Sequence, residues 1–262
     1  MIKKLLDRIF KPKSAKSEHA KHEHAKVASA KAEQPHNHRP TLRTKKTPHK
    51  NTNSINHGAT VIAHKTHKID RNLLSNAALK TTEGLHKAGF EAYIVGGAVR
   101  DLLLNRTPKD FDVATDATPE QVNRIFRRSR IIGKRFRLVH VLFGDETIEV
   151  STFRGSHLED SSDAKVADSG RIIRDNVFGS IIDDAVRRDF TANALYYNPA
   201  SQEVLDFHHG FNDIKAGVLR IIGKPETRYA EDPVRMLRAV RLSAKLDLKI
   251  DQATQAPIAK MA

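Results

Sequence analysis

Hydrophobic and polar positions follow two different patterns along the chain, and the patterns change near residue 68. Between Phe10 and residue 68 large apolar side chains are few, so this stretch cannot bury enough surface to offset the loss of chain entropy. From Ile69 onward apolar residues recur at the spacings of helices and strands. We therefore predict a disordered tail over residues 1–68, with one short amphipathic helix over 2–10, and an ordered region behind it.

The ordered region predicts helices alternating with strands. Helices are expected over residues 70–88, 98–104, 118–128, 183–195 and 232–246, and strands over 92–95, 110–113, 138–143, 147–153, 204–206 and 218–222. Gly89 is placed to end the first helix, and Thr118 followed by Pro119 is a good helix start. The polar residues 155–170 predict a mobile loop.

This order of elements predicts an α/β domain over residues 69–223. Residues 224–262 are expected to begin an α-helical region.

Charge is distributed unevenly between the two regions. The chain has a formal net charge of +14, and residues 1–68 hold 13 Lys and 3 Arg against 4 acids, which leaves only +2 for residues 69–262. The basic tail, residues 1–68, should therefore attract RNA or other polyanions, and salt should weaken that attraction. Nine of the fourteen histidines also lie in the tail, but their irregular spacing defines no metal site.

Composition excludes several classes of protein. The chain has no cysteine, which excludes disulfides, a thiol nucleophile and cysteine-bound zinc and fits a reducing compartment. No stretch approaches the roughly 20 apolar residues that span a bilayer, and the N-terminus has no convincing secretion signal. We expect a cytoplasmic protein without stable membrane insertion.

A glycine pair followed by two aspartates is the strongest local signal. Gly96 and Gly97 precede Asp110 and Asp112 by twelve intervening residues. On a strand the two carboxylates would share one face, where Mg²⁺ bound by carboxylates and substrate phosphates would relieve their repulsion. The glycines would let a triphosphate approach closely, facing the N–H groups of the next helix. The alternative is a solvated Asp-x-Asp on a surface strand.

Two further residues could join this site. Glu149 lies between apolar Ile148 and Val150 on a predicted strand, so it could be a third acidic group at the metal or an ordinary exposed residue. Arg154, five residues later, could reach a phosphate.

A second constellation combines two arginines with an acid. Arg187 and Arg188 precede Asp189, and Asn193 lies four residues after that acid on a predicted helix. The planar fork of arginine suits a triphosphate. A surface ion-pair cluster is the alternative.

A third constellation occupies the last predicted helix. Asp232, Arg235 and Arg238 are spaced three apart, which places neighbouring members on one helix face. An acid beside an arginine can offer an acceptor and donors to the edge of a base. Ordinary ion pairs along a helix are the alternative.

Taken together, the motifs resemble the family of class II tRNA nucleotidyltransferases and bacterial poly(A) polymerases. Four motifs occur in the order of that family, namely Gly96-Gly-x-Val-Arg-Asp101, Asp110-x-Asp112, Arg187-Arg-Asp-Phe-Thr191 and Glu231-Asp-x-x-Arg235. The resemblance covers about residues 70–250. The stretches 109–115, 133–141 and 228–241 look more like the poly(A) polymerase branch than the tRNA branch.

The resemblance implies a polymerase-β-like head with a mixed β-sheet and helices, and it implies roles for these residues. Since family members continue further, residues 224–262 would be the truncated start of a helical neck and RNA-binding domain. Asp110 and Asp112 would bind Mg²⁺, or Mn²⁺ as an alternative, with Glu149 as a candidate third ligand, and Asp189 would be a further essential acid. Asp232 and Arg235 would recognise the incoming adenine. The triphosphate and nucleotide contacts would come from Gly96, Gly97, Arg100, Asp101, Arg154, Arg187, Arg188, Asn193 and Arg238.

The function implied by the resemblance is template-independent transfer of AMP from ATP to the 3′ ends of mRNA and other RNAs. Two alternatives stay open. A CCA-adding tRNA enzyme would need CTP as well as ATP, and a catalytically incomplete RNA-binding fragment would incorporate no nucleotide.

Overall fold

The protein is described by a computed structural model that covers residues 57–134, 136–155, 164–166, 172–175 and 177–262. These residues belong to one unit, Asn51–Ala262. The predicted helix over 2–10 and most of the basic tail lie outside the described residues. The prediction that the tail extends to residue 68 is wrong, because strand β1 (Thr60–Ala63) and helix α2 (His64–His67) join the folded unit. Backbone pairing and burial of Ile62, which is 6% exposed, order a stretch whose composition suggested disorder.

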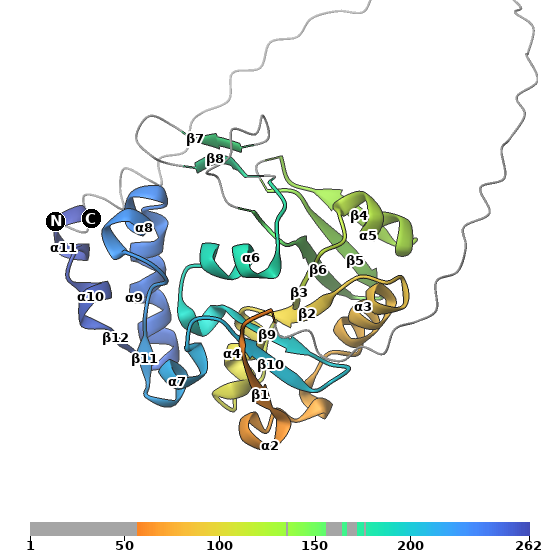
Figure 1. The fold of residues 1–262 in the computed structure, drawn as a ribbon, viewed down its shortest axis with the longest axis horizontal. Coiled ribbons are helices and arrows are strands. Elements are labelled where there is room, and N and C mark those ends of the chain that lie inside the picture. The colour runs from red at the N-terminus through yellow and green to blue at the C-terminus, as the bar shows by residue number, and fades with distance from the viewer. Residues whose placement is uncertain (1–56, 135, 156–163, 167–171, 176) are drawn as a thin grey trace, which may run out of the picture. The chain divides into compact units, whose positions relative to one another are not determined.

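An eight-stranded sheet organises the unit (Figure 1). Its strands follow the order β1, β10 (Glu203–Asp206), β9 (Leu195–Asn198), β2 (Ala92–Val95), β3 (Asp112–Thr115), β6 (Glu146–Thr152), β5 (Leu138–Phe143) and β4 (Ser129–Ile132). Neighbours are antiparallel except β3 and β6, which run parallel. A parallel pair needs a crossover connection, and helix α5 (Pro119–Ile125) with β4 and β5 supplies it. The predicted mixed α/β fold is confirmed.

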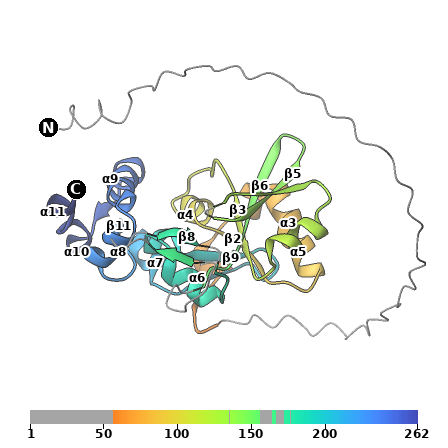
Figure 2. The same cartoon turned by 90° about the horizontal axis from the view of Figure 1, so that it is seen from above.

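Helices α3 (Asn76–Lys87) and α5 cover one face of this sheet, and Figure 2 shows them side by side. Each begins at a cap that its sequence encodes. The Ser75 hydroxyl accepts the N–H groups of Ala77 and Ala78, and Thr118 forms a capping box with Gln121. The apolar sides of both helices join the main core cluster with the inward side chains of β2, β3, β5 and β6. The predicted N-cap at Thr118 is confirmed, although the helix ends at Ile125 rather than near residue 128.

The opposite face of the sheet belongs to a second apolar cluster that includes helix α6 (Ile181–Arg187). Successive residues of β3 divide between the faces, with Val113 in the main cluster and Ala114 in the second. Because Asp112 lies two residues from Ala114, its side chain points to the α6 face. Strands β7 (Ala164–Val166) and β8 (Ile172–Asp175) pair with each other, whereas most of the predicted loop over 155–170 lies outside the described residues.

The C-terminal elements supply a third cluster, except for helix α7 (Gly210–Lys215), whose Phe211 and Ile214 belong to the main cluster. These elements are helix α7, strand β11 (Val218–Leu219), helices α8 (Pro225–Glu231) and α9 (Val234–Leu246), strand β12 (Lys249–Ile250), and helices α10 (Gln252–Gln255) and α11 (Ile258–Met261). Phe190 and Tyr229, both fully buried, belong to this cluster. Among the described helices none is both long and apolar enough to cross a bilayer.

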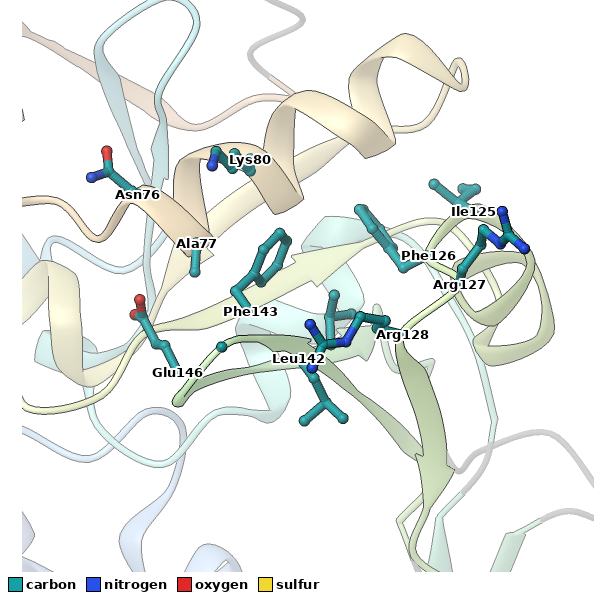
Figure 3. Close-up of a pocket in the computed structure, with 12 residues that line it drawn as sticks. Asn76, Ala77, Lys80, Ile125, Phe126, Arg127, Arg128, Leu142, Phe143 and Glu146 are labelled. Atoms are coloured by element: carbon teal, nitrogen blue, oxygen red, sulfur yellow. The ribbon is translucent and has the colours of Figure 1, made fainter.

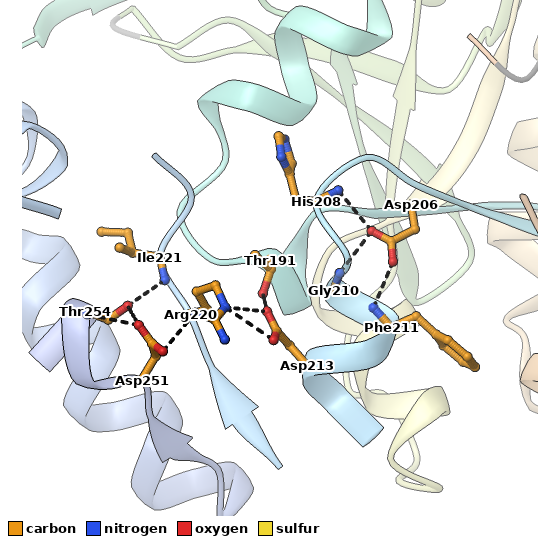
Figure 4. A network of polar contacts seen from close by, with 10 residues as sticks. All are labelled: Thr191, Asp206, His208, Gly210, Phe211, Asp213, Arg220, Ile221, Asp251 and Thr254. Atoms are coloured by element: carbon orange, nitrogen blue, oxygen red, sulfur yellow. Dashed lines mark hydrogen bonds and ion pairs between the residues drawn. The ribbon is translucent and has the colours of Figure 1, made fainter. Parts of the chain in front are cut away.

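A polar network fastens these elements to the sheet domain (Figure 4). The Asp213 carboxylate accepts from the Thr191 hydroxyl at 2.8 Å and from Arg220, and Arg220 also donates to Asp251 at 2.8 Å. The hydroxyl of Thr254 accepts the backbone N–H of Ile221 at 3.1 Å. The segment after Arg188 is therefore tied to α10 through side chains as well as through apolar packing.

One predicted helix is replaced in part by a turn and a strand. The predicted helix over 183–195 ends at Arg187, and Arg188 has extended backbone angles. The chain then passes through a short 3₁₀ turn, η2 (Thr191–Asn193), and Leu195 opens strand β9 in the middle of the sheet. A bridge from Phe190 to Ile221 and the pairing of β9 with β2 and β10 override the local helical pattern.

His67 predicts a pH effect on stability. Its Nε2–H donates to the carbonyl of Gln202 and its Nδ1 accepts the N–H of Ile69, both at 3.0 Å, so the neutral ring satisfies both contacts. Burial lowers the pKa of His67, so its contribution is present above about pH 6.5 and is lost as the pH falls below it. When the pH is lowered from about 7.5 to about 5.5, the unfolding free energy of the parent should fall. We expect that of His67→Gln to fall by about 1 kcal/mol less.

Urea unfolding at both pH values measures this difference. His209→Asn is the matched control, because His209 is exposed and asparagine tolerates its left-handed backbone. Equal pH dependence in His67→Gln and the parent would show that His67 does not carry the effect.

Candidate functional site

Two carboxylates lie side by side on the parallel strand pair. Asp112 opens β3 and is in register with Glu149 on β6. The Glu149 carboxylate is exposed and lies 3.3 Å from Nε2 of His140. Asp110 precedes the strand and is exposed, so the predicted start of this strand at residue 110 is wrong. Asp110 remains close enough to Asp112 to affect its ionisation.

Burial and neighbouring carboxylates dominate the electrostatics of Asp112. Burial, followed by the neighbouring Glu149 and Asp110 carboxylates, raises the pKa of Asp112 to about 6, although Arg188 acts in the opposite direction. Hard oxygen donors crowded in this way fit a divalent cation such as Mg²⁺. No three His, Asp or Glu side chains of the described residues converge as a complete metal cage. Mg²⁺ commonly uses one or two carboxylates plus substrate phosphates, so Asp110 and Asp112 are enough protein ligands for this ion.

Gly96 forms the turn that faces Asp112. It follows β2, whose last residue Val95 is in register with Asp112. Gly96 has φ +70° and ψ −130°, a backbone conformation that favours glycine. A Cβ at Gly96 would lie 3.6 Å from Nη1 of Arg188 and 3.8 Å from Oδ2 of Asp112. The turn thus brings a bare backbone against one cation and one carboxylate.

Arg188 is held in place by two groups that the sequence analysis did not identify. Its guanidinium donates to Oδ2 of Asp184 at 3.0 and 3.1 Å and to the Tyr196 hydroxyl at 2.8 Å. The Tyr196 hydroxyl donates in turn to Asp184 at 2.7 Å. Burial opposes the charge, but Tyr196 and Asp184 outweigh it and raise the pKa of Arg188. Asp184 could have been found from its spacing of four residues from Arg188.

A buried chain of polar contacts links α4 (Gly97–Leu103) to α9. Arg100 donates twice to Oδ1 of Asp101, at 2.6 and 2.8 Å, and once to Oδ1 of Asn193 at 2.6 Å. Asn193 donates to Asp189 at 3.0 Å, and Arg238 donates to the other oxygen of Asp189 at 2.7 Å. Asp189 and Asn193 meet as expected, but across the turn after α6 rather than on one helix.

These polar contacts favour the ionised form of Asp189. Burial opposes its charge, but Arg238, Asn193 and the N–H of Phe190 together hold the pKa of Asp189 below its usual value. The donors of Arg100 are engaged with Asp101 and Asn193, so Arg100 faces the protein interior rather than an open phosphate position.

Arg154 and Arg187 lie near the start of the segment after β6. Arg187 donates to the carbonyl of Gly155, and the backbone N–H of Arg154 donates to Oδ1 of Asp184 at 3.2 Å. The Arg154 guanidinium lies 4.9 Å from the centre of the Phe136 ring. Arg154 therefore lies beside Asp184, the residue that holds Arg188. Arg187, the last residue of α6, is tied to the residue that follows Arg154.

Asp232 and Arg235 are not arranged as the sequence suggested. Asp232 has an extended backbone and lies between α8 and α9, where its carboxylate accepts the N–H of Val234 at 3.3 Å. Arg235 is 8% exposed and donates instead to Glu231 at 2.9 Å and to the carbonyl of Arg228. The prediction that Asp232 and Arg235 lie side by side on one helix is wrong, because the helix begins only at Val234.

Arg228 is a third residue that the sequence analysis did not identify. Its Nη2 donates to the carbonyls of Arg187 and Arg188 at 2.7 and 2.8 Å, and its Nη1 pairs with Glu231 at 2.6 Å. These carbonyls follow the end of α6 and have no helical partner of their own. Helix α8 therefore fixes the turn that presents Arg188.

Comparison with known proteins identifies relatives of this arrangement. Residues 92–220 match the family described as the Poly A polymerase head domain. Poly(A) polymerase I of Escherichia coli O6:H1 is 55% identical over 206 residues, which make up 78% of this chain and 44% of that protein. The CCA-adding enzyme of Bacillus subtilis is 43% identical over 183 residues, which make up 70% of this chain and 44% of that protein.

The fold has a similar counterpart among solved structures. The crystal structure of the Bacillus stearothermophilus CCA-adding enzyme in complex with CTP matches with a TM-score of 0.60 at 34% identity, over 70% of this chain and 42% of that one. The chain thus spans less than half the length of these relatives.

Proposed function

The chain carries the head domain of the poly(A) polymerase family, and from this premise we propose that it transfers AMP from ATP to the 3′ ends of RNA. The observation that supports the proposal is the meeting of Asp112, the bare turn at Gly96 and the fixed cation of Arg188. The higher identity to Poly(A) polymerase I than to the CCA-adding enzyme favours ATP as the substrate. A cytoplasmic location, where RNA and ATP meet, belongs to the same proposal.

In this reaction the 3′ oxygen of RNA forms a bond to the α-phosphorus of ATP, and the bond to the β-phosphate oxygen breaks so that pyrophosphate leaves. Asp110 and Asp112 would hold Mg²⁺, or Mn²⁺ as an alternative, which would lower the pKa of the attacking hydroxyl and offset phosphate charge. Asp184 and Tyr196 fix Arg188 before substrate arrives, so its positive charge stabilises the triphosphate without reorganisation. Glu149 is a further candidate ligand beside Asp112.

The direct test incubates the full chain with Mg²⁺, labelled RNA and each nucleoside triphosphate in turn. Long extension of generic RNA with ATP alone is the expected result. Short additions that need CTP, on a tRNA lacking its last nucleotides, would favour the CCA-adding alternative instead. No incorporation from any triphosphate would contradict the proposal for this chain and leave the RNA-binding alternative, in which the basic tail supplies salt-sensitive affinity.

Asp232 and Arg235 are expected to have different roles. We propose that Asp232 contacts the adenine, because it lies between the helices and its carboxylate bonds only the N–H of Val234 among the described residues. Asp232→Ala should lower the ATP preference by about tenfold or more while costing about 1 kcal/mol or less of stability. Arg235→Ala should cost about 2–3 kcal/mol, because Glu231 and the Arg228 carbonyl lose a buried donor.

Incorporation from ATP and CTP, together with the melting temperature of each variant, measures both effects. Loss of ATP preference in a fully stable Arg235→Ala variant would contradict this division of roles. Val234→Ala is a control from the same segment, since Val234 is 52% exposed.

A further inference from the structure

A cavity of about 680 Å³ lies on the sheet face opposite the carboxylates. It opens between the start of α3, the end of α5 and the β5–β6 turn, and Val141 lies in its lining (Figure 3). Val141 faces Ile148 in the sheet register, and both belong to the main core cluster with Val113. Side chains of successive residues alternate, so Asp112 and Glu149 point to the other face.

Two aromatic rings give the cavity flat apolar walls. Phe126 and Phe143 are half-buried, and Figure 3 shows both rings below α3. Gly84 on α3 makes room for one of them, because a Cβ at that position would lie 2.9 Å from two ring atoms of Phe126. The backbone carbonyl of Arg128 accepts the N–H of Leu142 at 2.9 Å, which joins the end of α5 to the end of β5. The rings and the residues between them are therefore held in fixed positions.

The rim of the cavity is basic. Lys80, Arg127 and Arg128 line it, together with one carboxylate, that of Glu146, which accepts from the Ser75 hydroxyl. The three cationic side chains are exposed, and in the part of the chain that the structure describes none of them forms an ion pair. Residues 69–262 carry a net charge of only +2, so three unpaired cations beside one carboxylate are a local excess rather than a general property.

We propose that this cavity, with the basic surface around it, binds single-stranded RNA. RNA offers what the walls and the rim require, namely flat bases that stack on phenylalanine and phosphates that pair with arginine. Arg127 and Arg128 lie directly before β4, the edge strand of the sheet, so a nucleic acid backbone can reach them from solvent. An acidic peptide would pair with the arginines but would offer no flat group to stack on the rings of Phe126 and Phe143.

The position of the cavity indicates which part of an RNA it holds. From β3, which carries Asp112, the sheet order reaches edge strand β4 in three steps, or about 14 Å. RNA whose 3′ end lay at Asp112 would pass around β4 before entering the cavity, so the cavity would hold nucleotides upstream of the end. This choice of segment rests on the proposed function, whereas RNA binding at the cavity does not.

The test measures RNA binding by the full chain without metal or nucleoside triphosphate, so that no transfer can occur. The probe is an oligoadenylate of about twelve nucleotides that contains 2-aminopurine, whose fluorescence falls on stacking. We expect Phe143→Leu to weaken binding about fivefold or more and to reduce the quenching without changing the salt dependence. The double variant Arg127→Ala/Arg128→Ala should lower the slope of log Kd against log salt by about 1.4, or about 0.7 for each phosphate contact.

The matched control is Lys215→Ala/Lys260→Ala, which removes two exposed charges from other surfaces. The charge of the basic tail is the same in every variant, so it cancels in the comparison. Equal salt slopes for the two double variants, or unchanged quenching in Phe143→Leu, would overturn the proposal. Binding of poly-glutamate that depends on Arg127 and Arg128, with RNA binding unaffected, would assign the surface to an acidic protein and overturn it as well. Normal RNA binding by a chain that incorporates no nucleotide would count against the proposed function alone.

Discussion

Asp112→Asn is expected to abolish nucleotide transfer and to make the protein more stable. Loss of the carboxylate removes a ligand for the cation, so incorporation should fall by about three orders of magnitude or more. The raised pKa of Asp112, about 6 against an ordinary 3.8, means that its ionised form is disfavoured in the fold and costs stability above about pH 6. An amide does not ionise, so the variant should gain up to about 3 kcal/mol at pH 8. Thermal melts in chelator and incorporation assays measure the two effects.

Added Mg²⁺ provides an internal control for this prediction. It should raise the melting temperature of the parent, because a bound cation offsets the crowded charge of Asp112 and Glu149, and it should do little for Asp112→Asn. Glu149→Gln decides the role of the neighbour. Retained transfer would make Glu149 a residue that only tunes Asp112, whereas a loss similar to that of Asp112→Asn would make it a ligand. A less stable Asp112→Asn variant would contradict the electrostatic argument.

The sequence predicted best those elements whose signals are local. The strand over 92–95, the glycine turn after it and the helix start at Thr118 are all present, because burial, turn geometry and capping act within a few residues. Strands β5 and β6 likewise follow their alternating pattern closely. Each of these features would form in the same way in many different folds.

The failures arise where distant segments decide the local structure. Leu195 has helical neighbours in sequence, yet it becomes part of a central strand through pairing with β10 and β2. β1 lies behind a basic tail, and only its partner β10 reveals it as a strand. Neither partner can be deduced from a four-residue pattern, because a short apolar run fits a helix and a strand equally well.

The same distinction applies to the site. The motif spacing linked Gly96 with Asp112, the family resemblance added Arg188, and the structure brings the three together. The motifs did not predict Tyr196 or Arg228, which hold Arg188 and its carbonyl from other elements. Residues that contact a substrate form motifs, whereas residues that support them follow from packing. Their roles toward substrate stay predictions.

Arg100→Met is expected to cause the largest loss of stability among single changes in this site. Methionine keeps much of the volume but leaves Asp101 as a buried carboxylate without its two donors, and it leaves the Asn193 carbonyl without its donor. Breaking one side of a buried pair costs about 3–5 kcal/mol. The fold should therefore melt roughly ten degrees lower, and urea unfolding at neutral pH measures the change.

The double variant Arg100→Met/Asp101→Asn separates the lost pair from lost packing. Asparagine removes the stranded charge, so the double variant should recover about half of the loss or more, as expected when both partners of a buried pair are replaced. Arg100→Lys keeps a cation but not the planar fork, so it should fall between the parent and Arg100→Met even if the latter does not fold. A double variant no more stable than Arg100→Met would mean that packing of the long side chain, rather than the charge of Asp101, holds α4 against η2. The link from Asn193 through Asp189 to Arg238 would then be independent of Arg100.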